Sequence, residues 1–192
     1  MKKNLVTAVL MTIATTILLG IIYPLVVTGL AQVLFHDKAN GQLIQGNGKI
    51  IGSRIIGQAF SGPGYFHSRP SAVNYDATNS NGSQLGPTNK KLIDRVQGDM
   101  TNLQRENPNV PVPIDLVTTS ASGLDPEITP AGAEFQVHRV ATERKATEAE
   151  IMGLVAKHTE ARTWALLGEP RVNVLELNLA LDTRFGHIAR RK

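Results

Sequence analysis

The sequence predicts an α+β extracytoplasmic domain preceded by a single N-terminal transmembrane helix. Three observations predict it: an uncharged apolar run near the N-terminus, later segments with helical spacing and capping residues, and short runs typical of strands. The chain has 192 residues, 42% of them apolar and 19% charged, which is typical of a folded protein. It has no cysteine, which excludes disulfide scaffolds, thiolate metal sites and cysteine nucleophiles.

The first predicted element is a membrane-spanning helix within residues 1–35, and the domain is expected to occupy residues 36–192. Residues 5–35 contain no charged side chain, and about 20 apolar residues are enough to cross a bilayer. A cleaved signal peptide is the alternative, but its apolar region is roughly 7–15 residues long, which favours a retained anchor. Lys2 and Lys3 precede the run, so we expect the N-terminus in the cytoplasm.

Small or kinking residues recur every fourth position in this helix and share one face. A small-residue face lets another helix approach closely, so the pattern favours packing against a membrane partner. The alternative is that each threonine only hydrogen-bonds a carbonyl of its own helix. Proline at position 24 is expected to bend the helix near position 20. The residues of this stripe are Thr12, Thr16, Gly20, Pro24 and Thr28.

The first half of the domain predicts a hairpin, a long loop and a helix. Apolar runs flank Asn-Gly within residues 42–53, which is a hairpin signal. Residues 61–89 are dominated by Gly, Pro, Ser, Thr and Asn, so we expect a functional loop or a linker. Asn89 is the expected N-cap of a helix that runs to about Arg105 and ends before Pro108.

The second half predicts two more helices and a strand. One helix is expected to begin at Thr129-Pro130, and another at Thr147, where Glu150 completes a capping box. Gly168 is the expected end of the latter helix. Leucines alternate with other residues over 175–181, which predicts a half-buried strand.

The motifs predict no catalytic residue, no metal ligand and no cofactor bound by the chain itself. Phosphate loops and dinucleotide fingerprints are missing from the sequence, and the five histidines are scattered without the spacing of zinc ligands. Residues 79–84 loosely resemble the signature loop of ABC-type ATPases, and such a turn could present backbone N–H groups to a phosphate. Its candidate nucleotide-binding residues are Ser80, Gly82, Ser83 and Gln84, although an ordinary turn explains the composition better.

Several blocks, in order, resemble one family along nearly the whole chain. The sequence is similar to the C subunit of the Kdp-type potassium-transporting ATPase, a bacterial P-type pump. One departure is Ser-Asn-Gly-Ser-Gln at 80–84, where the family usually reads Ser-Gly-Gly-Ser-Asn. The matching blocks are Tyr-Pro-Leu at 23–25, Tyr-Phe-His-Ser-Arg-Pro-Ser-Ala at 65–72, Leu-Gly-Pro-Thr-Asn at 85–89, Val-Thr-Thr-Ser-Ala-Ser-Gly-Leu-Asp-Pro at 117–126 and Gly-Glu-Pro-Arg-Val-Asn-Val-Leu-Glu-Leu-Asn at 168–178.

The resemblance implies a single-pass subunit of the bacterial inner membrane with its domain outside the cytoplasm. The implied partners are a channel-like potassium-binding subunit and a P-type ATPase subunit. The family is also proposed to act as a catalytic chaperone that raises the ATP affinity of the ATPase subunit. ATP would then be reached only through the complex.

We expect the domain to contact its partners through the loops at 61–89 and 118–126, because aromatic and arginine side chains dominate interface energetics. The alternative for the two aromatic candidates is that they fill the domain's own core. The candidate contact residues are Tyr65, Phe66, Arg69, Ser120 and Asp125. A membrane-anchored hydrolase and a sensor domain are the other functions considered, and the sequence lacks the nucleophile–base spacing of the former.

Overall fold

The computed structural model describes residues 2–46 and 48–187. The chain divides into two compact units, Met1–Ile51 and Gly52–Lys192. The predicted α+β class with one apolar N-terminal helix is confirmed. The helix ends at Leu34, next to the predicted boundary after residue 35, whereas the first compact unit continues to Ile51.

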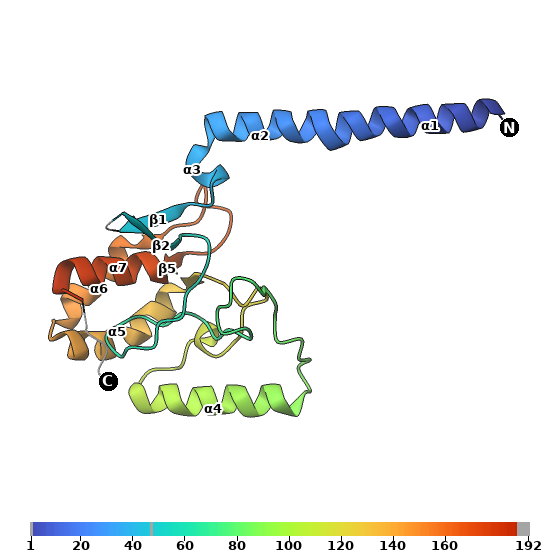
Figure 1. The fold of residues 1–192 in the computed structure, drawn as a ribbon. Helices are drawn as coiled ribbons and strands as arrows, with labels where there is room; N and C mark the ends of the chain where they lie inside the picture. Colours follow the sequence, from blue (N-terminus) through green and yellow to red (C-terminus); the bar gives the residue numbers. More distant parts are fainter. Residues whose placement is uncertain (1, 47, 188–192) are drawn as a thin grey trace. The chain divides into compact units, whose positions relative to one another are not determined.

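The N-terminal helix consists of three stretches: α1 (Lys2–Ile17), the π-helical turn η1 (Leu18–Ile22) and α2 (Tyr23–Leu34) (Figure 1). Among the described residues, this is the one helix long and apolar enough to cross a membrane. Pro24 has no N–H to donate, so the regular hydrogen-bond ladder is interrupted there. The N–H of Tyr23 donates to the Leu18 carbonyl, which widens the turn. The expected disturbance near Gly20 therefore takes the form of a π-helical turn.

The remainder of the first unit holds α3 (His36–Ala39) and a two-stranded sheet of β1 (Leu43–Gly46) and β2 (Lys49–Ser53). The boundary between the two compact units falls within β2. Gly48, in the turn between the strands, has a φ of 74°, which favours glycine. The predicted hairpin is therefore confirmed, with residue 47 outside the described part.

The second unit contains a small three-stranded sheet and several helices. The strand order is β3-β5-β4, with both pairs antiparallel, and Val172 of the central strand faces Ile128 on one side and Thr159 on the other. The elements are α4 (Lys90–Glu106), η2 (Ile114–Leu116), β3 (Glu127–Ile128), α5 (Pro130–Arg144), α6 (Glu148–Lys157), β4 (Thr159–Glu160), β5 (Arg171–Asn173) and α7 (Val174–Phe185).

Side-chain caps begin the helices at the predicted places. The Asn89 side chain accepts from the Lys91 N–H at the start of α4, and Thr129 accepts from Gly132 at the start of α5. Thr147 and Glu150 form the predicted capping box of α6. These bonds satisfy N–H groups that the first turn of a helix leaves free.

The prediction of a strand over 175–181 is wrong, because this segment lies within α7. The side chain of Asn173 caps the helix by accepting from the Glu176 N–H. Val174, Leu177 and Leu181 are buried at helical spacing, so they share one face. Leucines at every second position also fit the two-residue period of a strand, so the sequence pattern alone did not separate a strand from a helix.

The predicted end of α6 at Gly168 is also wrong, since the helix ends at Lys157. His158 caps its C-terminus through its backbone N–H and is only partly buried. Gly168 instead lies in the connection to β5, with a φ of 78°.

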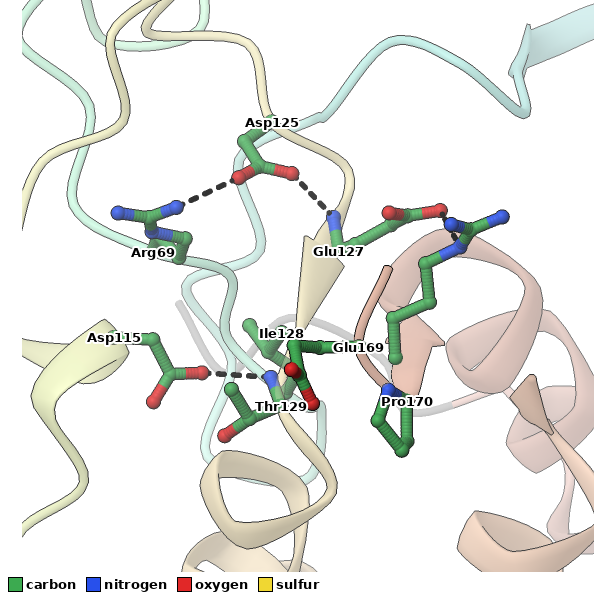
Figure 2. Close-up of a pocket in the computed structure, with 9 residues that line it drawn as sticks. Arg69, Asp115, Asp125, Glu127, Ile128, Thr129, Glu169 and Pro170 are labelled. Carbon is green, nitrogen blue, oxygen red and sulfur yellow. Dashed lines mark hydrogen bonds and ion pairs between the residues drawn. The ribbon is translucent and has the colours of Figure 1, made fainter. Parts of the chain in front are cut away.

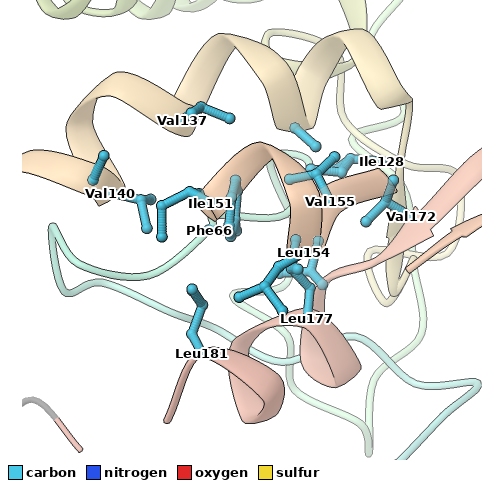
Figure 3. Packing of buried hydrophobic residues seen from close by; sticks show 13 residues of the cluster. Phe66, Ile128, Val137, Val140, Ile151, Leu154, Val155, Val172, Leu177 and Leu181 are labelled. Carbon is cyan, nitrogen blue, oxygen red and sulfur yellow. The ribbon is translucent and has the colours of Figure 1, made fainter. Parts of the chain in front are cut away.

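The core lies where α5, α6 and α7 face one another (Figure 3). Val140 of α5, Ile151 of α6 and Leu181 of α7 are fully buried there. Phe66, which belongs to the long loop rather than to a helix, is also fully buried in this cluster. Burial of such a side chain contributes roughly 1.5–3 kcal/mol, so the loop is anchored by the core.

Two buried amide side chains fix the loop backbone next to Phe66. Asn178 of α7 accepts from the Phe66 N–H and donates to the Phe66 carbonyl, both at 2.9 Å. Gln136 of α5 accepts from the His67 N–H at 2.8 Å and donates to the His67 carbonyl at 3.1 Å. The two amides thus supply the bonds that a neighbouring strand would otherwise provide.

A buried guanidinium ties the same loop to the ends of two helices. The Arg144 side chain, with 0% of its surface exposed, forms an ion pair with Asp182 at 2.9 Å. It also donates to the carbonyls of Gly64 and Gly186 at 2.7 and 2.8 Å. Its guanidinium lies 4.7 Å from the centre of the Tyr65 ring. This charge is therefore well compensated.

Replacing Asn178 with alanine is expected to lower the free energy of unfolding by roughly 2–4 kcal/mol, because it leaves the buried N–H and carbonyl of Phe66 unpaired. The measurement is denaturant unfolding of the full chain in detergent, followed by circular dichroism. Asn102→Ala, at an exposed position of α4, is the matched control and should change stability by less than about 0.5 kcal/mol. Equal losses in both variants would contradict the role of the amide.

Candidate functional site

Two of the candidate contact residues form an ion pair at the surface of the second unit. Arg69 Nη1 lies 3.0 Å from Asp125 Oδ2, and the two side chains are 28% and 27% exposed (Figure 2). The other oxygen of Asp125 accepts from the Glu127 N–H at 3.0 Å. The Tyr75 hydroxyl donates to the Arg69 carbonyl, and burial raises the pKa of that hydroxyl. The loop at 61–89 and the loop at 118–126 therefore meet at this pair.

Of the other three contact candidates, Phe66 and Ser120 are buried and Tyr65 is half-buried. Phe66 belongs to the core, as in the alternative considered for it. The Tyr65 hydroxyl donates to Asp182. The pKa of this hydroxyl is raised, mainly by burial and secondly by the bond to Asp182. Ser120 is buried, and its N–H donates to the Pro70 carbonyl at 3.4 Å. Arg69 and Asp125 are thus the candidates that a partner could reach most directly.

An open hollow of about 260 Å³ lies beside the ion pair, between β3 and the residues that precede β5 (Figure 2). Its lining contains four carboxylates and two guanidinium groups, and one of the carboxylates, Glu169, also pairs with Arg162 outside the lining. The lining therefore carries a small excess of negative charge. Such a surface attracts cationic groups. The charged lining residues are Arg69, Asp115, Asp125, Glu127, Glu169 and Arg171.

Asp115 is one of the charged residues of this hollow that the sequence analysis did not single out; the others are Glu127, Glu169 and Arg171. One of its carboxylate oxygens accepts from the Thr129 N–H at 2.7 Å, next to the N-terminus of α5. The other oxygen is buried and has no hydrogen-bond partner among the described residues. A Cβ at Gly132 would lie 2.7 Å from this carboxylate, so a larger residue there would require Asp115 to move. Asp115 has no motif around it, and only the packing of α5 reveals its role.

Glu127 is a further carboxylate of this hollow. It lies 2.9 Å from Arg171, which also pairs with Glu160 at 3.0 Å. Burial raises the pKa of Glu127, while the positive charge of Arg171 opposes the shift. Within the described residues, no group of three or more potential ligand side chains could hold a metal ion.

A second open hollow, of about 530 Å³, is also lined by both residues of this ion pair. It is lined mainly by apolar side chains and by the backbone of the loop at 118–126. The Gly57 N–H donates to the Leu124 carbonyl at 2.7 Å, and a Cβ at Gly57 would approach the Asp125 carbonyl to 2.5 Å. Glycine at 57 therefore allows the close backbone contact that shapes this hollow.

The predicted nucleotide loop packs against the loop at 118–126. Ser80 Oγ donates to the Ser122 carbonyl at 3.2 Å, and Gln84 donates to Asn81 at 2.9 Å. A Cβ at Gly82 would lie 2.9 Å from the Ala121 carbonyl. Ser83 is partly buried, and residues 70–89 contain no lysine or arginine. These contacts explain the small residues by packing, and nucleotide binding stays a prediction.

One threonine of the stripe, Thr12, shows the alternative role considered for these residues. Thr12 Oγ1 donates to the Ala8 carbonyl at 2.9 Å. The Cβ position of Gly20 has only the Thr16 methyl nearby, at 3.9 Å, so a side chain at position 20 would fit within the helix itself. Packing of Gly20, Pro24 and Thr28 on a partner stays a prediction.

Comparison with known proteins covers both the helix and the domain. The family model described as the K+-transporting ATPase c chain matches residues 5–183. A potassium-transporting ATPase KdpC subunit of Koribacter versatilis is 66% identical over 184 residues, covering 95% of each chain. The KdpC subunit of Rhodopseudomonas palustris strain BisB18 is 52% identical over 95% of this chain and 98% of its own. That of Methylobacterium nodulans is 49% identical over 97% of this chain and 100% of its own. The chain therefore belongs to the KdpC family, the c chains of potassium-transporting ATPases.

Proposed function

We propose that this chain is a non-catalytic accessory subunit of an ATP-driven pump for high-affinity potassium uptake. The names of the relatives support membership of such a complex, and the long apolar helix supports a place in the membrane. Its role is to help assemble and stabilise a channel-like potassium-binding subunit and a P-type ATPase subunit.

The observation that carries this proposal is the ion pair of Arg69 and Asp125 between two open hollows. One hollow carries excess negative charge and the other is mainly apolar, so together they offer both complementary charge and apolar area to a protein partner. Arginine is enriched at the centre of such interfaces. A cationic segment of a partner subunit fits the acidic hollow, with the partly exposed Asp125 facing it.

The proposed orientation places the N-terminus in the cytoplasm and the domain outside the bacterial inner membrane. Lys2 and Lys3 before the helix support it through the positive-inside tendency. A protease added to cells with a permeabilised outer membrane should then cut the segment 117–130. Cleavage only after the inner membrane is opened would place the domain in the cytoplasm and overturn this orientation.

The chaperone role belongs to the same proposal in an indirect form. With the domain outside, the chain would raise the ATP affinity of the ATPase subunit through helix contacts within the complex. Direct binding at Ser80, Gly82, Ser83 and Gln84 is the alternative, and a cytoplasmic domain in the protease experiment would favour it. The internal hydrogen bonds of that loop support the indirect route.

Replacing Asp125 with asparagine is expected to weaken assembly with the partner subunits roughly tenfold, because a partly desolvated charge at an interface is worth about 1.4 kcal/mol. Asparagine keeps an oxygen for the Glu127 N–H. The measurement is the yield of the complex co-purified with the tagged chain, together with potassium uptake.

Asp99→Asn is the matched control, because Asp99 also pairs with an arginine and its side chain is 36% exposed, close to the 27% of Asp125. Both variants should lose at most about 1 kcal/mol of stability. Unchanged complex yield in Asp125→Asn, or an equal loss in Asp99→Asn, would remove the ion pair from the docking surface.

A leucine at position 20 tests the membrane stripe. Gly20→Leu is expected to reduce the co-purified partner subunits, since the bulkier side chain blocks close helix approach while fitting within its own helix. Gly29→Leu is the matched control off the stripe, because a Cβ at Gly29 meets nothing within 4 Å. If both variants assemble like the unaltered chain, the stripe does not contact a partner.

A further inference from the structure

A short apolar turn projects from the second unit between β4 and β5. Residues 163 and 167 exchange two backbone hydrogen bonds of 2.9 Å, and the Leu166 N–H also donates to the Thr163 carbonyl at 3.2 Å. These bonds give the turn a defined shape. We call residues 164–167, Trp-Ala-Leu-Leu, the apolar tip.

The side chains of the apolar tip are exposed although three of them are large and apolar. Trp164 is 86% exposed, Leu166 78% and Leu167 53%. Trp164 is also the single tryptophan of the chain. Single exposed apolar residues are common, but a run of them on a projecting turn marks a contact with something outside the domain.

The backbone of the tip is unfavourable for the residues that it holds. Trp164 and Ala165 have φ values of 53° and 58°, the sign that both central residues of a type I′ turn require. Such turns strongly favour Asn-Gly, because side chains with a Cβ disfavour this conformation. Burial within the domain does not compensate the cost for Trp164, whose ring is in solvent.

A short connection links the second unit to the apolar N-terminal helix. The membrane helix ends at Leu34 and the second unit begins at Gly52, so residues 35–51 are the whole connection. Fully extended, these 17 residues span at most roughly 60 Å, and the hairpin within them shortens that reach. A tether of this length gives a surface residue a high effective concentration at the membrane.

We propose that the apolar tip inserts into the interfacial region of the bilayer that anchors the chain, as a second membrane contact. Tryptophan prefers this region, where its ring is apolar and its N–H can still reach water or a headgroup. Four residues offer far less area than the roughly 800 Å² per partner of a stable protein interface, but enough to support an existing anchor.

The charges around the tip indicate whether its insertion requires anionic lipid. Arg162 and Glu169 form an ion pair of 2.6 Å at the base of the turn, and the tip itself carries no charge. Insertion should therefore occur in zwitterionic phosphatidylcholine without anionic lipid. The proposal rests on membrane anchoring of the chain and is independent of its orientation and of docking through Asp125.

The single tryptophan makes the test direct. The full chain is placed in phosphatidylcholine nanodiscs whose acyl chains carry bromine either near the headgroup or near the chain end. We expect bromine near the headgroup to remove about half of the tryptophan emission, because interfacial side chains lie ~5–10 Å into the headgroup–acyl boundary. Bromine near the chain end should quench the tryptophan emission less. Acrylamide in the aqueous phase should quench the emission of the chain in nanodiscs less than that of the chain unfolded in denaturant.

Leu166→Asp is expected to abolish quenching by the brominated lipid, because a charge at the tip opposes insertion. Ile93→Asp, at an exposed apolar position of α4, is the matched control and should leave quenching unchanged. Circular dichroism verifies that both variants are folded. Emission that bromine does not quench but acrylamide quenches fully would mean that the tip is in water. Emission shielded from both quenchers would mean a protein contact. Either result overturns the proposal.

Discussion

The hydrogen bonds from the buried amides of Gln136 and Asn178 to the backbone of Phe66 and His67 are the constraint on which the rest of the second unit depends. The long loop has no strand to pair with, so its buried N–H and carbonyl groups need these partners. Once they are fixed, Phe66 completes the core. Arg69 follows two residues after His67, and its place at the surface is set by the same bonds.

At the surface, the carboxylates of Asp115 and Asp125 connect separate segments, as the amides of Gln136 and Asn178 do in the interior. Asp125 joins Arg69 to the backbone of β3, while Asp115 holds the start of α5 through Thr129. Each carboxylate thus links segments that are far apart in the sequence. The structural bonds leave excess negative charge in the acidic hollow, which is why this surface suits a cationic partner segment.

The sequence predicted local features well and long-range ones poorly. Caps at Asn89, Thr129 and Thr147 identified three helix starts, because capping depends on residues only three positions apart. The leucines of α7 were wrongly predicted to form a strand, because their spacing fits the period of a strand as well as that of a helix. Arg69 and Asp125 were foreseen as candidates, but their pairing and the role of Asp115 depend on how α5 and β3 pack, which no local pattern encodes.

We propose that the surface around Arg69 and Asp125 docks on the other subunits of the pump. Hydrogen–deuterium exchange of the full chain, alone and in the assembled complex, tests it most directly. Docking through this surface should slow exchange in the complex for residues 118–127 and leave residues 97–105 of α4 unchanged. Unchanged exchange over 118–127, together with protection of α4, would contradict it and move the interface to that helix.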